Sequence, residues 1–136
     1  MKPLLFLLLV ALAGCVSTDV RDDEDREPIT SEPALMSWLG DRNYIVEQTG
    51  FTSRRTQGAL GNTFVVSGYA SGTLRTWTFG TASAAERALR EVRRDRGPAA
   101  RSSQVSYYTS GPLLVEYVGS DAGLRADLAE VLGRAR

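Results

Sequence analysis

The sequence predicts an α+β fold in which a single antiparallel sheet of four or five strands carries helices packed on one face. Segments typical of strands occur in pairs joined by short glycine-containing connections, and such short connections require antiparallel pairing. Segments with helical periodicity stand before, between and after these pairs. Residues 34–136, about 103 in number, suffice for one domain and are too few for two.

The first predicted helix begins at Pro33, a residue suited to the first helical position, and ends at Gly40. Leu35, Trp38 and Leu39 fall on one side of it. Residues 44–49 are rich in β-branched and aromatic side chains and predict a strand. Residues 50–61 fit either a continuation of this pairing or a loop.

Two further strands are predicted at residues 63–67 and 74–79, because residues 68–72 have the length and glycine content of a hairpin loop. On the second of these strands, Arg75, Trp77 and Phe79 share one side. We expect the side with the two aromatic residues to face the core.

The clearest helix starts at Ser83, which has capping-box spacing with Glu86, and it ends at Gly97-Pro98. Its apolar positions follow helical spacing: Ala85, Ala88, Leu89 and Val92. The outer side is basic: Arg87, Arg90, Arg93, Arg94 and Arg96. Such a stripe can contact phosphates, or it can be a solvated face with internal ion pairs, which the interleaved acidic residues favour. A third alternative is contact with the chain's own acidic N-terminal segment.

Residues 104–109 and 113–118 predict a second hairpin across residues 110–112. Asp121 then caps a last helix that ends at Gly133. Its apolar stripe is Leu124, Leu128, Val131 and Leu132.

Residues 1–14 have the layout of a signal peptide, with Lys2 followed by an apolar run and a cleavage site of small residues. The apolar run is shorter than the roughly 20 residues that a membrane-spanning helix needs. The segment Leu12-Ala13-Gly14-Cys15 resembles the lipobox of bacterial lipoproteins. The resemblance implies cleavage between Gly14 and Cys15, and attachment to a membrane through Cys15 acylated with chains such as palmitate. No aspartate follows the cysteine, which implies the periplasmic face of the outer membrane in a Gram-negative host and otherwise the cell membrane.

Residues 15–33 form the link between this cysteine and the domain. Residues 16–33 hold seven acidic residues and two arginines, a net charge of −5, with few apolar side chains. We expect this stretch to be disordered, because it has little apolar surface to offset the entropy of ordering. It fits either a spacer that holds the domain off the lipid or solvated filler.

The ending of the chain carries a second resemblance. Residues 113–119, followed by an aspartate-capped helix that closes in Leu132-Gly133, are similar to a group of small exported bacterial proteins of unassigned function. The similarity extends as a pattern over residues 35–133. Members of this group have no agreed activity, so the resemblance implies nothing about catalysis.

The composition excludes several chemistries. The chain has no histidine, so a Ser-His-Asp or Cys-His arrangement and a zinc site built on imidazole are excluded. Cys15 is the only cysteine, which excludes an intramolecular disulfide. The glycines fit neither a P-loop nor a dinucleotide-binding motif, and residues 68–72 only approach the nucleophile elbow. We therefore predict no enzyme activity, no catalytic residue, no cofactor and no metal.

Glu47 and Glu116 lie on predicted strands and would allow acid–base chemistry if they faced each other, although exposed strand glutamates are the ordinary explanation. Tyr107 and Tyr108 are adjacent on a strand, so they point to opposite faces and we expect one of them to be exposed. With Arg75, this tyrosine would form an interaction surface for an envelope protein. The sequence gives no oligomeric state and favours no nucleic-acid partner.

Two alternatives to this binding module stay open. One is a structural lipoprotein without a specific ligand. The other is a carrier of a small ligand or lipid, which requires a cavity lined by Trp77 and Tyr117.

Overall fold

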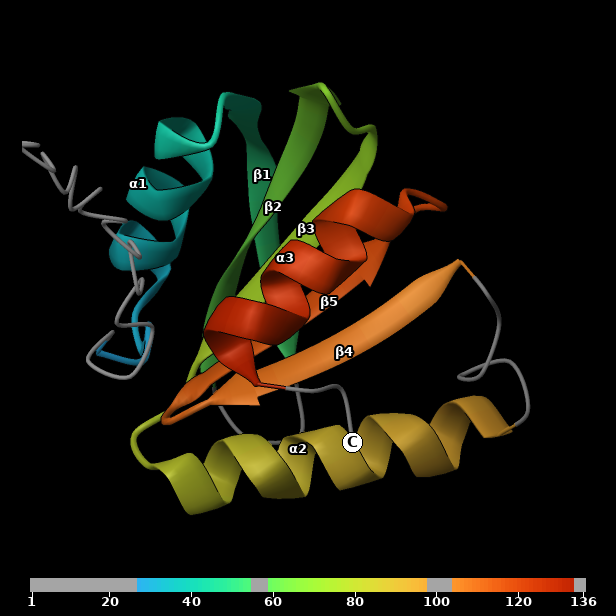
Figure 1. Ribbon diagram of the computed structural model, residues 1–136. Coiled ribbons are helices and arrows are strands. Elements are labelled where there is room, and N and C mark those ends of the chain that lie inside the picture. Colours follow the sequence, from blue (N-terminus) through green and yellow to red (C-terminus); the bar gives the residue numbers. More distant parts are fainter. Residues whose placement is uncertain (1–26, 55–58, 98–103, 134–136) are drawn as a thin grey trace, which may run out of the picture.

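The computed structural model describes residues 27–54, 59–97 and 104–133 (Figure 1). Its five strands form one open antiparallel sheet in the order β1-β2-β3-β5-β4. The elements in chain order are α1 (Glu32–Asp41), β1 (Tyr44–Arg54), β2 (Ala59–Gly68), β3 (Gly72–Thr78), α2 (Ala82–Arg96), β4 (Val105–Ser110), β5 (Leu113–Val118) and α3 (Ala122–Leu132). The predicted α+β fold with a single antiparallel sheet is confirmed.

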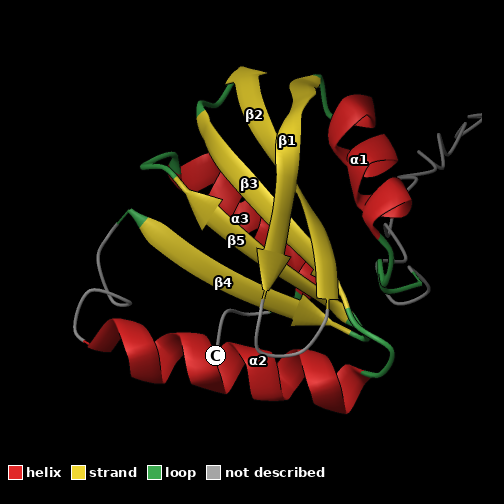
Figure 2. Ribbon diagram, turned by 180° about the vertical axis from the view of Figure 1, so that it is seen from behind, coloured by secondary structure: helices red, strands yellow, loops and turns green. Residues whose placement is uncertain are grey.

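Helices lie on both faces of the sheet, so the expectation that all of them pack on one face is not confirmed. Side chains of α1 and α3 form one core with the side of β5 that carries Val115 and Tyr117. Side chains of α2 form a second core with Leu114, which points to the opposite face. In Figures 1 and 2, α3 crosses one face, while α2 runs beside β4 at the lower end of the sheet. Residues Leu113 to Tyr117 are all buried because β5 is covered from both sides.

The ambiguous stretch between residues 50 and 61 belongs largely to two long strands that pair with each other. A β-bulge interrupts the pairing, since Gln48 lies opposite Phe64 whereas Gly50 lies opposite Thr63. Thr49 is therefore the extra residue. An extra residue shifts the alternation by one, so every side chain beyond it points to the face opposite to the one expected from an uninterrupted strand.

The boundaries of two helices differ from the prediction. Helix α1 begins at Glu32 with Ser31 as its N-cap, and it continues through Gly40. Asn43 follows the helix in the left-handed region, at φ 64°, which asparagine tolerates better than most residues. Helix α2 is capped by Thr81, whose Oγ1 accepts a hydrogen bond of 3.2 Å from the backbone N–H of Ala84.

The C-terminal helix agrees with its prediction. Asp121 is the N-cap of α3, and its carboxylate accepts a hydrogen bond of 2.7 Å from the backbone N–H of Leu124. Gly133 follows the helix at φ 83°, a backbone conformation that favours glycine. The four residues of the expected apolar stripe are all buried: Leu124, Leu128, Val131 and Leu132.

Two polar networks fasten α1 to the elements with which it shares the first core. At its C-terminal end, the Arg42 guanidinium lies 3.2 Å from the Asp127 carboxylate, which also accepts a hydrogen bond of 2.7 Å from the Tyr44 hydroxyl. At its N-terminal end, the Glu32 carboxylate accepts hydrogen bonds from the Asn62 amide, at 2.6 Å, and from the hydroxyl of the buried Thr76. The boundary expected at residue 33 therefore falls inside a helix that both networks fasten to the domain.

Candidate binding surface

One face of the sheet is covered only in part. Helix α2 packs on Trp77, Tyr107 and Leu114, toward one end of the sheet. The rest of this face, formed by β1, β2 and the first part of β3, faces outward and carries no helix in Figure 2. On it, 62% of Ile45 and 42% of Val65 are accessible to solvent.

The strand register makes these residues neighbours. Val65 lies opposite Glu47 on β1 and opposite Thr73 on β3, so the three side chains share one face. Ile45 lies two residues from Glu47, and Arg75 lies two residues from Thr73, which places both on that same face. We call this surface the open face; its residues are Ile45, Glu47, Val65, Thr73 and Arg75.

A buried carboxylate borders the open face. Glu116 on β5 is 1% exposed and lies opposite Arg75 on one side and Tyr107 on the other. Its Oε1 lies 2.5 Å from Nη1 of Arg75, and its Oε2 accepts a hydrogen bond of 2.7 Å from the Tyr107 hydroxyl. Arg96, at the last position of α2, places Nη2 3.0 Å from the same Oε2. We call these four residues the arginine–glutamate cluster.

The arginine–glutamate cluster is positively charged, because two guanidinium groups share one carboxylate. The side chains of Arg75 and Arg96 are 38% and 40% exposed, whereas that of Glu116 is 2% exposed. The Arg96 guanidinium also lies over the Tyr107 ring, 5.7 Å from its centroid. The buried carboxylate therefore orients the two guanidinium groups. Their solvent-exposed N–H groups can bind an anionic group.

Of the three residues expected to form the interaction surface, the structure brings Arg75 and Tyr107 together on the Glu116 carboxylate, whereas Tyr108 points to the other face of the sheet. Arg75 does border an uncovered part of the sheet. Tyr107 and Tyr108 point to opposite faces as predicted, but they are only 3% and 2% exposed, so the expectation that one is exposed is wrong. The reason is the two-sided coverage of β4: α2 covers Tyr107, and the Tyr108 hydroxyl lies 3.3 Å from a backbone oxygen of α3.

Two other pairs of residues considered from the sequence are not neighbours. Glu47 and Glu116 share a face but stand on β1 and β5, with β2 and β3 between them, so they form no carboxylate pair. Trp77 and Tyr117 lie in the cores on opposite faces of the sheet, so they cannot line one cavity.

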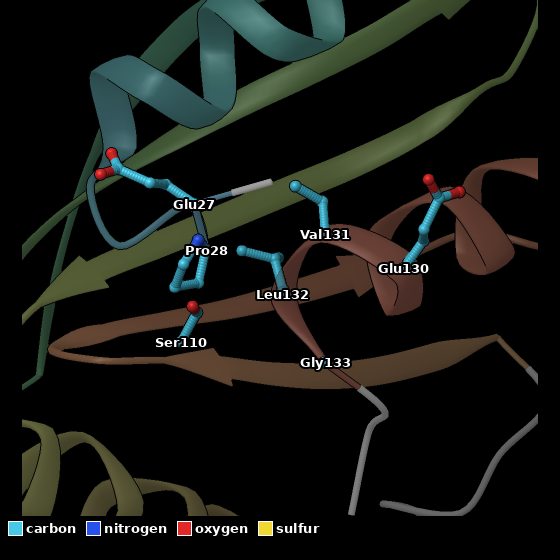
Figure 3. Close-up of a pocket in the computed structure, with 7 residues that line it drawn as sticks. All are labelled: Glu27, Pro28, Ser110, Glu130, Val131, Leu132 and Gly133. Carbon is cyan, nitrogen blue, oxygen red and sulfur yellow. The ribbon is translucent and has the colours of Figure 1, made fainter. Parts of the chain in front are cut away.

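A pocket of about 250 Å³ lies elsewhere, where the segment that enters the domain passes the end of α3 (Figure 3). Its walls are Glu27, Pro28, Ser110, Glu130, Val131, Leu132 and Gly133. In Figure 3 the Leu132 side chain points toward Pro28. This volume is below the roughly 300–1,000 Å³ typical of ligand sites.

The described part of the chain contains neither a cluster of metal-binding side chains nor a helix that could span a membrane. No three histidine, cysteine, aspartate or glutamate side chains gather there as metal ligands would. None of its helices combines the length and the apolar character needed to cross a membrane. Gly14 and Cys15 lie outside the described residues.

Sequence reasoning did not single out Ile45 or Val65 as surface residues of interest, and it considered Arg96 only as part of the basic stripe on the outer side of α2. The alternation of side chains along β1 and β2 would have placed Ile45 and Val65 on the face opposite to the buried residues of these strands. The alternation does not show that this face is uncovered, because that depends on where α2 packs. No local signal pointed to the pairing of Arg96 with Glu116, because the two residues are twenty positions apart in the chain. No protein-family model, curated protein or solved structure matches this chain.

Proposed function

We propose that this protein is a non-enzymatic binding or adaptor module of the cell envelope, exported and anchored to lipid through acylated Cys15. The resemblance of residues 12–15 to a lipobox supports the anchor. In a Gram-negative host the module would stand on the periplasmic face of the outer membrane, and otherwise on the cell membrane. The partner is an envelope protein that binds the open face.

One observation carries the binding proposal: two exposed aliphatic side chains adjoin a cluster of half-exposed arginines on an uncovered sheet. Apolar contacts beside arginine are typical of the centre of protein interfaces. We expect the partner to place an apolar side chain on Ile45 and Val65. A carboxylate beside it would meet the guanidinium groups of Arg75 and Arg96, whose pairing with Glu116 already holds them in place.

Crosslinking and capture from a detergent extract of the envelope test this surface. The variant Ile45→Ser/Val65→Ser removes apolar area without touching the arginine–glutamate cluster, and we expect it to lose the captured partner. The matched control is Leu60→Ser, which removes an aliphatic side chain that is 82% exposed at the far end of β2. Equal capture by all three proteins contradicts binding at the open face.

The anchor is tested separately. Cells grown with labelled palmitate should incorporate it into the wild-type protein and not into Cys15→Ser. Capture of the partner by both forms would place the specificity in the domain alone, and capture by the acylated form alone would show that placement at the membrane matters. If no protein is captured with either form, the structural lipoprotein becomes the better explanation.

A further inference from the structure

A second exposed apolar group lies at the opposite end and on the opposite face of the sheet from Ile45. Phe51 is 88% exposed and Leu60 is 82% exposed, the two highest values among the large apolar residues described. Phe51 lies opposite Asn62 in the register, and Leu60 stands two residues before Asn62 on the same strand. All three side chains therefore emerge on one face, with Phe51 and Leu60 as diagonal neighbours roughly 7–8 Å apart.

The β-bulge at Thr49 creates this arrangement. Without the extra residue, alternation from Gln48 would send Phe51 to the other face of the sheet, away from Leu60. Bulges often serve to re-aim a side chain. Here the result is that two large apolar side chains are brought together in water, which is unfavourable for the isolated domain unless something covers them.

The chain enters the domain beside this pair. The first residue of α1, Glu32, accepts a hydrogen bond from Asn62, the cross-strand partner of Phe51. The segment before α1 passes the turn between β4 and β5, where Thr30 adjoins Gly111. Glu27 is twelve positions after Cys15, and a chain of twelve Cα–Cα steps spans at most about 40 Å whatever its conformation.

We propose that Phe51 and Leu60, which we call the hairpin patch, dock the domain onto the lipid surface to which Cys15 is attached. This inference rests on the lipid anchor of the proposed function. Amphipathic helices at membrane surfaces bury their apolar face about 5–10 Å deep in the boundary between headgroups and acyl chains, and we expect these two side chains to enter the same region. Such a contact is too weak to recruit a free protein, but the tether holds the patch near the lipid at high effective concentration. The open face, on the other side of the sheet, then stays accessible to a protein partner.

Quenching of tryptophan fluorescence by brominated phospholipids tests this docking. The acylated full chain is reconstituted into vesicles of phosphatidylethanolamine and phosphatidylglycerol, with Leu60→Trp in one sample and Tyr69→Trp in the matched control. Tyr69 is 80% exposed and directly follows Gly68, the last residue of β2, which is eight residues and about 26 Å from Leu60 along the strand. Trp38 and Trp77 give the background, which is measured in the wild-type protein.

We expect the bromine atoms to quench the tryptophan at position 60 about five-fold more than the one at position 69, since only the first enters the lipid. Adding Phe51→Ser to Leu60→Trp should reduce this difference. Equal quenching at both positions overturns the proposal. A change in the fluorescence of the tryptophan at position 60 that follows the protein concentration and is independent of lipid also overturns the proposal. Such a change shows that the residue contacts a second copy of the protein.

Failure of the anchor and failure of the docking are distinguishable. Absence of incorporated palmitate contradicts the anchor alone. The thiol of Cys15 is then coupled to a maleimide lipid, and the same comparison between positions 60 and 69 decides whether the hairpin patch enters the membrane.

Discussion

Arg75 and Glu116 lie opposite each other on β3 and β5, with Nη1 of the arginine 2.5 Å from Oε1 of the glutamate, a residue that is 1% exposed. A carboxylate at this depth is tolerated because each oxygen has a partner: Arg75 on one, and Tyr107 and Arg96 on the other. The pair links the open face to the core under α2. The stability of the domain and the geometry of the binding surface therefore depend on the same side chain.

Replacing Glu116 by alanine should lower the free energy of unfolding by about 2–3 kcal/mol, because it removes the acceptor of the Tyr107 hydroxyl and the carboxylate that pairs with two part-exposed arginines. Glu116→Gln keeps the volume and a hydrogen-bond acceptor, so we expect a smaller loss of about 1–2 kcal/mol. Urea denaturation of the purified variants measures both. The control is Glu47→Ala, on the same face but exposed, which should change stability by less than about 0.5 kcal/mol. Equal midpoints for Glu116→Ala and Glu47→Ala would refute this role.

Tyr44 makes stability depend on pH in the alkaline range. Burial, and then the hydrogen bond to Asp127, raise the pKa of Tyr44 from 10.0 to about 12. A pKa raised in the folded state means that folding favours the neutral phenol, so this stabilisation is complete below pH 10 and is lost as the pH rises through 12. Burial also raises the pKa values of Tyr108 and Tyr117, which adds to the loss in the same direction.

We therefore expect the urea midpoint of the wild-type protein to fall between pH 10 and 12. Tyr44→Phe should lower the free energy of unfolding at pH 7 by about 1 kcal/mol, through loss of the hydrogen bond, and should show a shallower alkaline decline. Absorbance of tyrosinate, followed against pH in both proteins, identifies the group that titrates. If the urea midpoint of Tyr44→Phe falls with pH as steeply as that of the wild-type protein, the loss of stability is due to other tyrosines.

Much of the fold follows from local signals in the sequence. Helical periodicity identified the buried side of α2, where Ala85, Ala88, Leu89 and Val92 are all buried. The short connections identified the hairpins, because two to five residues with glycine allow only antiparallel neighbours. The aspartate at position 121 identified the start of α3, since its carboxylate binds the backbone N–H of a residue three positions on.

What could not be predicted depends on contacts between distant segments. The side on which α2 packs, and hence the burial of Tyr107 and the exposure of Val65, is decided by the order of β3, β5 and β4 in the sheet. The bulge at Thr49 was not predicted, although Gly50 beside it is a residue type that often marks a bulge, and it decides the face on which Phe51 emerges. The candidate surface is made of such contacts, so the sequence placed only Arg75 on it.

The residue that caps the start of α2 differs from the one that the sequence pattern predicts. Ser83 and Glu86 have capping-box spacing, but the side chain that caps the helix belongs to Thr81. Thr81→Ala should therefore cost about 1 kcal/mol of stability, since the N–H of Ala84 loses its acceptor. Ser83→Ala, inside the first turn and exposed, should be neutral or slightly stabilising because alanine favours the helix. Thermal denaturation followed by circular dichroism ranks the stabilities of the two variants. A larger loss of stability for Ser83→Ala would mean that Ser83, and not Thr81, caps the helix.

Gly61 and Gly40 should respond in opposite ways to the same substitution. Gly61 lies opposite Trp77 in the pairing of β2 with β3. A Cβ added to Gly61 would overlap the backbone oxygen of Thr76 and lie 2.8 Å from Cδ1 of Trp77. The backbone cannot give way without disturbing the core under α2, so we expect Gly61→Ala to cost about 1–3 kcal/mol or more. At Gly40, inside α1, an added Cβ has no neighbour within 4 Å, and alanine favours the helical conformation.

Gly40→Ala should therefore stabilise the protein by about 0.5–1 kcal/mol. Both variants are compared by urea denaturation at one pH, so that the chemical change is identical and only its surroundings differ. A loss at both positions would mean that α1 bends or opens at Gly40 in solution. Tolerance at Gly61 would mean that Trp77 does not pack against β2, and the second core would then be organised differently from the structure described.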